Sequence, residues 1–323
     1  MAVITGTNWN AYDGATMTAR EIYGRTLAYL AETNDKIVGM TADLEKTTAI
    51  KFFADKYPER FYNVGIAEQN CAGVAAGLAT CGKIPFVVTY AAFGSMRMVE
   101  MIRQEICYPN LNVKIACSHG GVTPANDGAS HQAIEDMGIL RTIPNMTVIM
   151  PADYVSARKL VRAAAEFNGP VYLRFTRDAI PVIYGDDEEF EIGKAKILRE
   201  GKDIAIIANG DTVRLALEAA GVLEAAGIEA RVLDMHTVKP LDTDAVVNAV
   251  LDCDQIITVE DHNIINGLGA AVACVAAEMG RGRVWRLGIQ DQFGQSAPYE
   301  RLLELNGVTV ENIVDVARKL TKK

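Results

Sequence analysis

The sequence lacks several motifs that would assign a chemistry directly. Its six cysteines form no C-x-x-C pair and its four histidines form no H-E-x-x-H or comparable spacing, so a zinc site held by this chain is not predicted. It contains no Walker A sequence, and the nearest approach to G-x-G-x-x-G, at 267–272, ends in valine. We interpret that stretch as tight helix packing and not as a dinucleotide site.

Long apolar runs and excess positive charge are also missing. No apolar run approaches the ~20 residues that a membrane span needs, and residues 1–18 lack the basic and apolar regions of a signal peptide. The net charge of −9 argues against a nucleic-acid or anionic-membrane surface. Most cysteines lie in apolar segments, as reduced core thiols do. The sequence therefore predicts a cytoplasmic protein with no disulfide framework and no nucleic-acid or membrane partner.

The length and the apolar pattern predict two α/β domains. A chain of 323 residues is long enough for two ordinary domains. In the first half, runs rich in Val and Ile alternate with helical patterns, which indicates a mostly parallel sheet with helices on both faces. Strands are expected at 36–40, 83–90, 112–117, 146–150 and 171–175, and helices at 18–33, 67–81, 95–107 and 152–167.

An acidic, turn-rich stretch at 181–193 interrupts this pattern and predicts a linker. A second alternating unit follows it, with strands expected at 203–208, 229–234, 255–260 and 284–287 and helices near 212–226, 243–251, 267–279 and 298–305. The chain is thus expected to form two doubly wound domains. The division that we expect is an N-terminal extension (1–14), a first domain (15–182), a linker (183–195) and a smaller second domain (196–323).

The most informative motif is G-I-A-E-Q-N at 65–70, which places one carboxylate, that of Glu68, at the start of an apolar helix. Apolar surroundings penalise the charged form of a carboxyl group, so a glutamate kept there is suited to hold or share a proton. A simpler explanation is that an acidic residue in the first turn complements the helix dipole. The residues around Glu68 favour the chemical role.

Two aromatic residues, Tyr90 and Phe93, stand three positions apart at the end of the strand expected at 83–90. Ligands of open α/β sheets bind at the carboxyl ends of strands. Core filling alone would also account for two aromatic residues. Their position makes them candidates for one wall of a ligand site.

A long polar loop follows the strand expected at 112–117. It begins at His119 and also contains Asp127 and His131. Loops of this kind, anchored at the tip of a buried strand, often carry function. A solvated His-Asp pair is the alternative, and composition alone does not separate the two.

Seven motifs in sequence order make residues from about 15 to 320 resemble the C-terminal section of transketolase. They are T-A-R at 18–20, T-A-D-L at 41–44, G-I-A-E-Q at 65–69, T-Y-A-A-F at 89–93, N-D-G-A-S-H-Q at 126–132, P-A-D at 151–153 and R-F-T-R at 174–177. The resemblance implies a pyrimidine-binding domain followed by a small C-terminal domain. It also implies thiamine diphosphate as the cofactor.

The resemblance assigns roles around that cofactor. Glu68 would hydrogen-bond the aminopyrimidine N1′ and share a proton with it, while Tyr90 and Phe93 would pack against the pyrimidine ring. Met96 stands where the family has a third aromatic residue, and its thioether would fill part of that space. Asp43 would lie close to the cofactor in a supporting role.

The same resemblance implies a site for the phosphate of a sugar phosphate. Arg20, His119 and Arg177 match phosphate-binding positions, where a guanidinium fork suits phosphate oxygens. Thr47 stands where the family commonly has serine and would add a hydroxyl contact.

Three residues would face the reacting part of the sugar. Asp127 matches the residue that reads the C2 hydroxyl of the donor, and His131 matches a histidine near the reacting carbons. His131 and His119 would relay protons to the sugar oxygens. With Glu68, these two histidines form the catalytic set that the resemblance implies.

Half of the family's cofactor site is missing from the sequence. Enzymes of this family bind the diphosphate through Mg²⁺ or Ca²⁺ held by a G-D-G motif and a later asparagine, and Gly210-Asp211-Thr212 lacks the final glycine. Mg²⁺ needs a set of oxygen ligands that is not recognisable here. We therefore expect the metal and the diphosphate to be bound mainly by a second polypeptide, an N-terminal transketolase subunit with the G-D-G motif.

The resemblance then implies a split transketolase of pentose phosphate metabolism. Two copies of each chain would form a heterotetramer, so that this chain also self-associates as a dimer. The assembled enzyme would transfer a two-carbon ketol unit from a ketose phosphate to an aldose phosphate.

Other members of the wider enzyme class share the carboxylate motif. One is 1-deoxyxylulose-5-phosphate synthase, usually a single long chain, and another is the beta subunit of a 2-oxo acid dehydrogenase, whose histidine loop differs. D-G-A-S-H-Q at 127–132 and the phosphate-binding arginines favour transketolase. A non-catalytic scaffold module is a further alternative, against which the retention of Glu68 and both aromatic residues argues.

Overall fold

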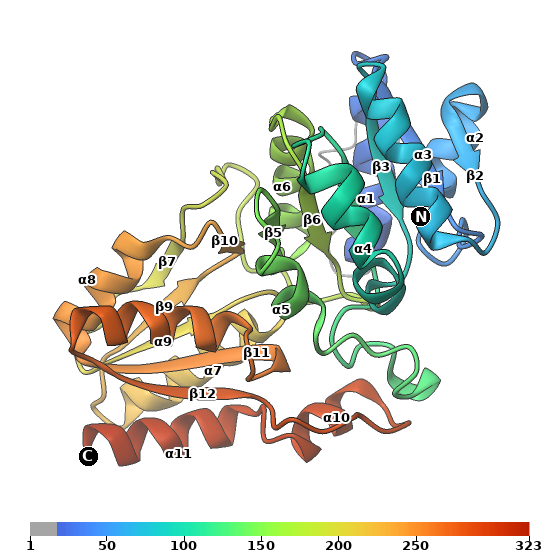
Figure 1. The fold of residues 1–323 in the computed structure, drawn as a ribbon. Helices are drawn as coiled ribbons and strands as arrows, with labels where there is room; N and C mark the ends of the chain where they lie inside the picture. Colours follow the sequence, from blue (N-terminus) through green and yellow to red (C-terminus); the bar gives the residue numbers. More distant parts are fainter. Residues whose placement is uncertain (1–17, 323) are drawn as a thin grey trace.

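The computed structural model describes residues 18–322, and the extension expected at 1–14 lies outside this range. Within it two α/β units lie side by side, the first drawn in blue to green and the second in yellow to red (Figure 1). Each unit contains a mostly parallel sheet. The expected fold class, with two parallel-dominated α/β units, is confirmed.

Within the described residues the first sheet has seven strands in the order β10-β5-β6-β4-β3-β1-β2. They are β1 (Ile37–Thr41), β2 (Phe61–Asn63), β3 (Ile84–Val88), β4 (Lys114–Cys117), β5 (Thr147–Ile149), β6 (Val171–Arg174) and β10 (Thr237–Lys239). The pairs from β5 to β2 are parallel, and β10 runs antiparallel to β5. Every residue of β1, β3, β4, β5 and β6 is buried, which explains their nearly continuous apolar sequence.

Helices cover both faces of the first sheet. The elements are α1 (Ala19–Leu30), α2 (Lys51–Lys56), α3 (Glu68–Thr80), α4 (Val99–Met101), α5 (Asp136–Arg141) and α6 (Tyr154–Glu166), with the 3-10 turns η2 (Pro58–Arg60) and η5 (Ala125–Asp127) and the π-helical segments η3 (Phe93–Arg97) and η4 (Ile102–Cys107). Neighbouring side chains of a strand point to opposite faces. Phe86 of β3 therefore packs with α1 and α6, while Val87 packs with α3 and η4.

Within the described residues the second sheet has five strands in the order β12-β11-β8-β9-β7. They are β7 (Lys196–Arg199), β8 (Ile204–Ala208), β9 (Ala230–Asp234), β11 (Gln255–Asn263) and β12 (Arg283–Ile289). Its helices are α7 (Thr212–Ala225), α8 (Thr243–Cys253), α9 (Leu268–Met279), α10 (Tyr299–Leu305) and α11 (Val310–Thr321). Apolar clusters fill both faces of this sheet as well.

The two units are tied together more closely than the sequence pattern indicated. β10 belongs to the second half of the chain but pairs with β5 of the first sheet. The stretch expected as a linker contains Tyr184, which is buried and whose backbone N–H donates to the Asp153 carboxylate at 2.9 Å. This stretch is therefore fixed against the first unit.

Within residues 18–322, no helix combines the length and apolarity that crossing a membrane requires. The six cysteines all fall in this range and are free thiols. The same range holds no group of three or more His, Cys, Asp or Glu side chains placed to bind a metal ion.

Candidate active site

The candidate site lies at the carboxyl ends of β3 and β4, which are neighbours in the first sheet. Beyond the two strands, Tyr90 pairs with Ser118 in a parallel bridge that extends their alignment. His119 follows with a positive φ of 63°, a conformation that side-chain-bearing residues adopt rarely and that turns the chain into the polar loop. Function-bearing residues often occupy such conformations.

Four rings meet at this edge, and we call Tyr90, Phe93, His119 and His131 the ring cluster. Tyr90 stacks on His119 with 3.9 Å between ring centroids and on Phe93 with 5.7 Å. His131 meets Phe93 edge-on at 5.5 Å and Tyr90 at 6.1 Å. The structure thus brings together both expected aromatic residues and both loop histidines.

Glu68 is the first residue of α3 and is buried, with a side chain only 7% exposed. Its Oε1 accepts a hydrogen bond from a guanidinium nitrogen of Arg97 at 2.8 Å. The Arg97 guanidinium also lies over the Phe93 ring, 4.3 Å from its centroid. The carboxylate expected in purely apolar surroundings therefore has a cationic partner, which connects it to the ring cluster.

Sequence reasoning missed Arg97. The available signal was its position four residues after Phe93 in a helical stretch, because residues at this spacing lie on one face of a helix. Met96, expected to replace a third aromatic residue, has a side chain 42% exposed. Of these two neighbours, Arg97 is the one that covers Phe93.

His119 lies in an environment that disfavours its charged form. Burial, and after it the electrostatic influence of the neighbouring Arg20, Arg177 and His131, lowers the pKa of His119 to about 3. Its Nδ1 lies 2.8 Å from the Ser118 hydroxyl. At neutral pH His119 is therefore a neutral imidazole, able to contact a phosphate through a hydrogen bond rather than through charge.

We predict that His119 stays neutral throughout the range from pH 5 to pH 8. A pKa of about 3 places its protonation well below this range, whereas an unperturbed histidine titrates near 6.5. Nitrogen-15 NMR of the histidine side chains should show a flat titration curve for His119, with the signal assigned by its loss in His119→Gln. A midpoint between pH 5 and pH 8 would contradict the prediction.

The expected phosphate-binding arginines are held by backbone oxygens. Arg20 donates to the Thr47 carbonyl at 2.7 Å, and Arg177 donates to the Pro124 carbonyl at 2.8 Å. Arg177 also lies 3.5 Å from the carboxylate of Asp127. Both arginines thus hold loop backbone by hydrogen bonds, and Asp127 forms an ion pair with Arg177.

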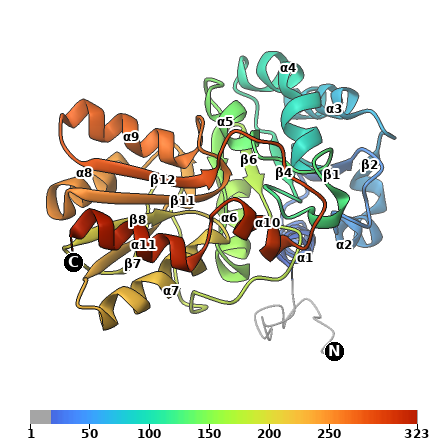
Figure 2. The same ribbon diagram turned by 90° about the horizontal axis from the view of Figure 1, so that it is seen from below.

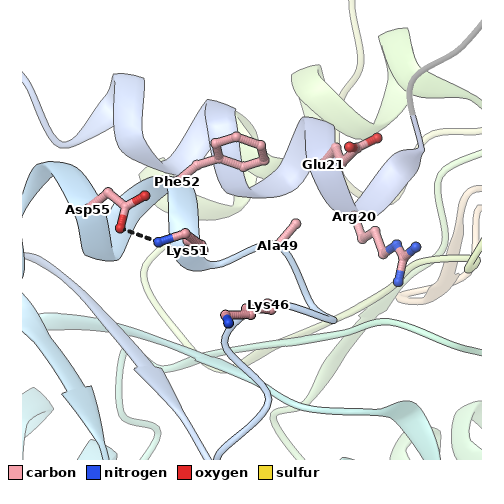
Figure 3. A pocket seen from close by; sticks show the side chains of 7 residues that line it. All are labelled: Arg20, Glu21, Lys46, Ala49, Lys51, Phe52 and Asp55. Atoms are coloured by element: carbon pink, nitrogen blue, oxygen red, sulfur yellow. Dashed lines mark hydrogen bonds and ion pairs between the residues drawn. The ribbon is translucent and has the colours of Figure 1, made fainter.

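Two cavities flank the loop at 43–47. One, of about 200 Å³, is lined by Arg20, Glu21, Lys46, Ala49, Lys51, Phe52 and Asp55. Figure 3 shows the Lys51–Asp55 ion pair in it and the Arg20 side chain pointing away from that pair. The other, of about 330 Å³, is lined by Asp43, Leu44, Glu45, Lys46, Thr47 and Asn63.

Asp43 has a positive φ of 60°, and its N–H donates to Asn63 Oδ1 at 3.1 Å. Asp43 and Thr47 therefore line the second cavity, while Arg20 lines the first. Arg20 contacts the loop at 43–47 by donating a hydrogen bond to the Thr47 carbonyl.

The second unit holds the histidine loop in place. Gln132 of the loop donates to the Gln295 carbonyl at 2.9 Å, and the Ser296 hydroxyl donates to the Asn126 carbonyl at 2.7 Å. These contacts come from the segment just before α10, which lies against the first unit in both views (Figures 1 and 2). The position of Asp127 and His131 therefore depends on the second unit.

Comparison with known proteins identifies the family. The profile described as "Transketolase, pyrimidine binding domain" matches residues 15–182, and that described as "Transketolase, C-terminal domain" matches residues 193–313. The chain belongs to the transketolase family. A Methanocaldococcus jannaschii protein, provisionally named a transketolase C-terminal section, is 46% identical over 307 residues, which cover 94% of this chain and 96% of that protein.

Other members of the transketolase family match along different shares of their length. A 6-deoxy-6-sulfo-D-fructose transketolase subunit from Clostridium sp. (strain MSTE9) is 39% identical, with 94% of each chain covered. A 1-deoxy-D-xylulose-5-phosphate synthase from Geobacter sulfurreducens is 40% identical over 90% of this chain but 46% of its own. Among solved structures, a split-gene transketolase described as an inactive beta4 tetramer has 47% identity and a TM-score of 0.89, covering 95% of this chain and 99% of that one.

The transketolase family uses thiamine diphosphate with a metal, and the candidate site fits the pyrimidine end of that cofactor. The guanidinium of Arg97 is a planar group with N–H donors on its edge. It bonds to Glu68 and covers the Phe93 face, which are the two contacts expected for an aminopyrimidine ring. A flat, nitrogen-rich group is therefore accommodated between the carboxylate and the aromatic wall.

Proposed function

We propose that this chain is the second subunit of a two-chain transketolase that transfers a two-carbon ketol unit from a ketose phosphate to an aldose phosphate. The observation that carries the proposal is that the buried Glu68 carboxylate and the face of Phe93 meet the same planar group, the Arg97 guanidinium. When bound, thiamine diphosphate supplies the nucleophilic carbon for this transfer. This chain supplies the Glu68 carboxyl group and the aromatic rings of Tyr90 and Phe93 that hold the pyrimidine ring of the cofactor.

Each residue of the site has a part in the proposal. Glu68 holds a proton at the pyrimidine N1′, Tyr90 and Phe93 bind the ring, and Asp43 supports the site from its cavity. His131 moves protons at the sugar oxygens, and His119, which is a neutral imidazole at neutral pH, relays them through its hydrogen bonds. The remaining residues bind the substrate, through its phosphate (Arg20, Thr47, His119 and Arg177) and its donor hydroxyl (Asp127).

We also propose that the partner chain, an N-terminal transketolase subunit, carries the G-D-G motif and binds both Mg²⁺ or Ca²⁺ and the diphosphate. Support comes from relatives that match along nearly their whole length and are named as a section or a subunit of a transketolase. We propose that the two chains form a heterotetramer in the cytoplasm, with two copies of each chain. We propose for this chain the division expected from the sequence, with domains at 15–182 and 196–323 and a linker at 183–195, except that β10 of the second half joins the first sheet.

Calorimetry tests the need for a partner. Thiamine diphosphate and Mg²⁺ are titrated into the chain alone and into the complex with a co-expressed chain that carries the G-D-G motif. We expect tight binding only in the complex, because the charged end of the cofactor is held there. Tight binding and sugar turnover by the chain alone would refute the two-chain proposal.

Activity assays of the complex test the reaction. Ketol transfer from xylulose 5-phosphate, or from another ketose phosphate in a panel, to an aldose phosphate is the expected result. Turnover that requires pyruvate would instead assign the chain to a 1-deoxyxylulose-5-phosphate synthase, and oxidative decarboxylation of a 2-oxo acid to a dehydrogenase. Cofactor binding without any turnover would favour a scaffold role.

A further inference from the structure

Arg97 makes the two contacts that the proposed function gives to the cofactor ring. Its guanidinium bonds to Glu68 Oε1 at 2.8 Å and lies 4.3 Å from the centroid of the Phe93 ring. Phe93 is backed in turn by Tyr90. A pyrimidine ring that bonded the same carboxylate and lay on the same face of Phe93 would overlap the guanidinium.

We propose that Arg97 occupies the pyrimidine subsite in the cofactor-free protein and that the cofactor must displace it. The inference rests on the proposed function, because that function assigns the subsite. Arg97 is a positioning residue in this account, since it keeps the carboxylate paired and the aromatic face covered until the ring enters. Its contacts therefore compete with cofactor binding.

The local fold supports this role. Phe93 and Arg97 are the first and last residues of η3. Single-turn π-helical segments are rare in proteins, and those that occur are often found at functional sites. The Arg97 side chain is 54% exposed while that of Glu68 is 7% exposed. The arginine can therefore swing into solvent at little cost, whereas the carboxylate stays fixed at the start of α3.

The contacts of Arg97 with Glu68 and Phe93 determine how much it weakens cofactor binding. A charge-assisted bond to a buried carboxylate and a cation–π contact are each modest when one partner is half exposed. Together they correspond to roughly a tenfold change in affinity. Removing the guanidinium should therefore strengthen cofactor binding about tenfold.

The test titrates thiamine diphosphate at fixed Mg²⁺ into the cofactor-free complex of this chain with its co-expressed partner. Arg97→Met keeps an unbranched side chain about as long as the aliphatic part of arginine and removes the guanidinium, and Arg97→Ala removes the side chain beyond Cβ. The matched control is Arg103→Ala, which removes an exposed arginine from the following segment, η4. We expect Kd to fall about tenfold in both Arg97 variants and to stay unchanged in the control.

The outcomes separate this proposal from the proposed function. Tighter binding is a result that damage to the fold would not produce, so it supports displacement of Arg97. Equal or weaker binding in both Arg97 variants overturns the inference and leaves the proposed function standing, as does equal tightening in Arg103→Ala. If the unmodified complex binds no thiamine diphosphate, the proposed function fails and this inference fails with it.

Discussion

Glu68→Gln is expected to lower the turnover of the assembled transketolase by about 10²- to 10⁴-fold, the usual contribution of a positioned acid or base. Glutamine preserves the size of the side chain and its place at the start of α3, but it cannot hold a proton at the pyrimidine N1′. The measurement is the initial rate of ketol transfer at saturating thiamine diphosphate and Mg²⁺, so that weaker cofactor binding does not contribute.

Glu100→Gln is the matched control for this experiment. Glu100 is an exposed glutamate of α4, so the same change in charge occurs near the site without touching the buried carboxylate. Its turnover should remain near that of the unmodified enzyme. A Glu68→Gln enzyme with near-normal turnover would show that the proton is handled elsewhere and would remove the central role given to Glu68.

The parts of the fold that followed from the sequence are those with a strong local signal. β3 and β4 are completely buried, so their apolar runs could be recognised in the sequence. The residues that follow each run could then be placed at the carboxyl end of a strand. β10 (Thr237–Lys239) has three residues and only one apolar side chain, that of Val238, which is too little pattern to be detected. The antiparallel strand added to the first sheet therefore became visible only in three dimensions.

Within the site, the residues predicted from the sequence are those that stand at element ends. Glu68 begins a helix and His119 follows a strand, so their neighbours in sequence already indicate their position. Arg97 gave only a weak signal, its spacing of four residues from Phe93, because an exposed arginine in a helical stretch is ordinary. Its pairing with Glu68 joins residues 29 positions apart and depends on how η3 packs beside α3.

The R-F-T-R motif at 174–177 shows the same limit. Its last residue, Arg177, lies beside the loop and contacts Pro124 and Asp127, whereas its first, Arg174, is completely buried between the two units. Arg174 Nε lies 2.9 Å from Asp136 Oδ2, and the guanidinium donates to the carbonyls of Ala133 and Asp261 at 3.0 and 2.8 Å. One side chain of β6 thus joins the end of the histidine loop to β11 of the second unit.

Asp261 adds a second tie between the units. Its carboxylate accepts from the Val122 N–H at 3.0 and 3.1 Å. The carboxylate approaches so closely that a Cβ at Gly121 would lie 1.9 Å from its oxygen, and Gly121 has a φ of 61°. A glycine is required at this position for both reasons. The start of the histidine loop is therefore fixed by the second unit, as its end is by Arg174.

Arg174→Met is expected to destabilise the protein by about 3–5 kcal/mol, because it leaves the Asp136 carboxylate buried without its counter-ion. The apparent melting temperature should fall by roughly 4–7 °C, at about 1.5 °C per kcal/mol for a chain of 323 residues. Arg162→Met is the control, since Arg162 pairs with Glu166 on the exposed face of α6 and such pairs contribute about 0–1 kcal/mol. Calorimetric melting of both variants measures the difference.

A double-mutant cycle attributes the loss to the buried pair. Asp136→Asn removes the charge but keeps an oxygen for the Tyr172 hydroxyl, which donates to Asp136 at 2.6 Å. If the stranded carboxylate causes the instability, Arg174→Met combined with Asp136→Asn should be less destabilised than the sum of the single changes. Strict additivity, or a shift in Arg174→Met no larger than in Arg162→Met, would show that the buried ion pair does not stabilise the protein. Loss of stability through this pair should also loosen the histidine loop, because the same guanidinium binds the Ala133 carbonyl at its end.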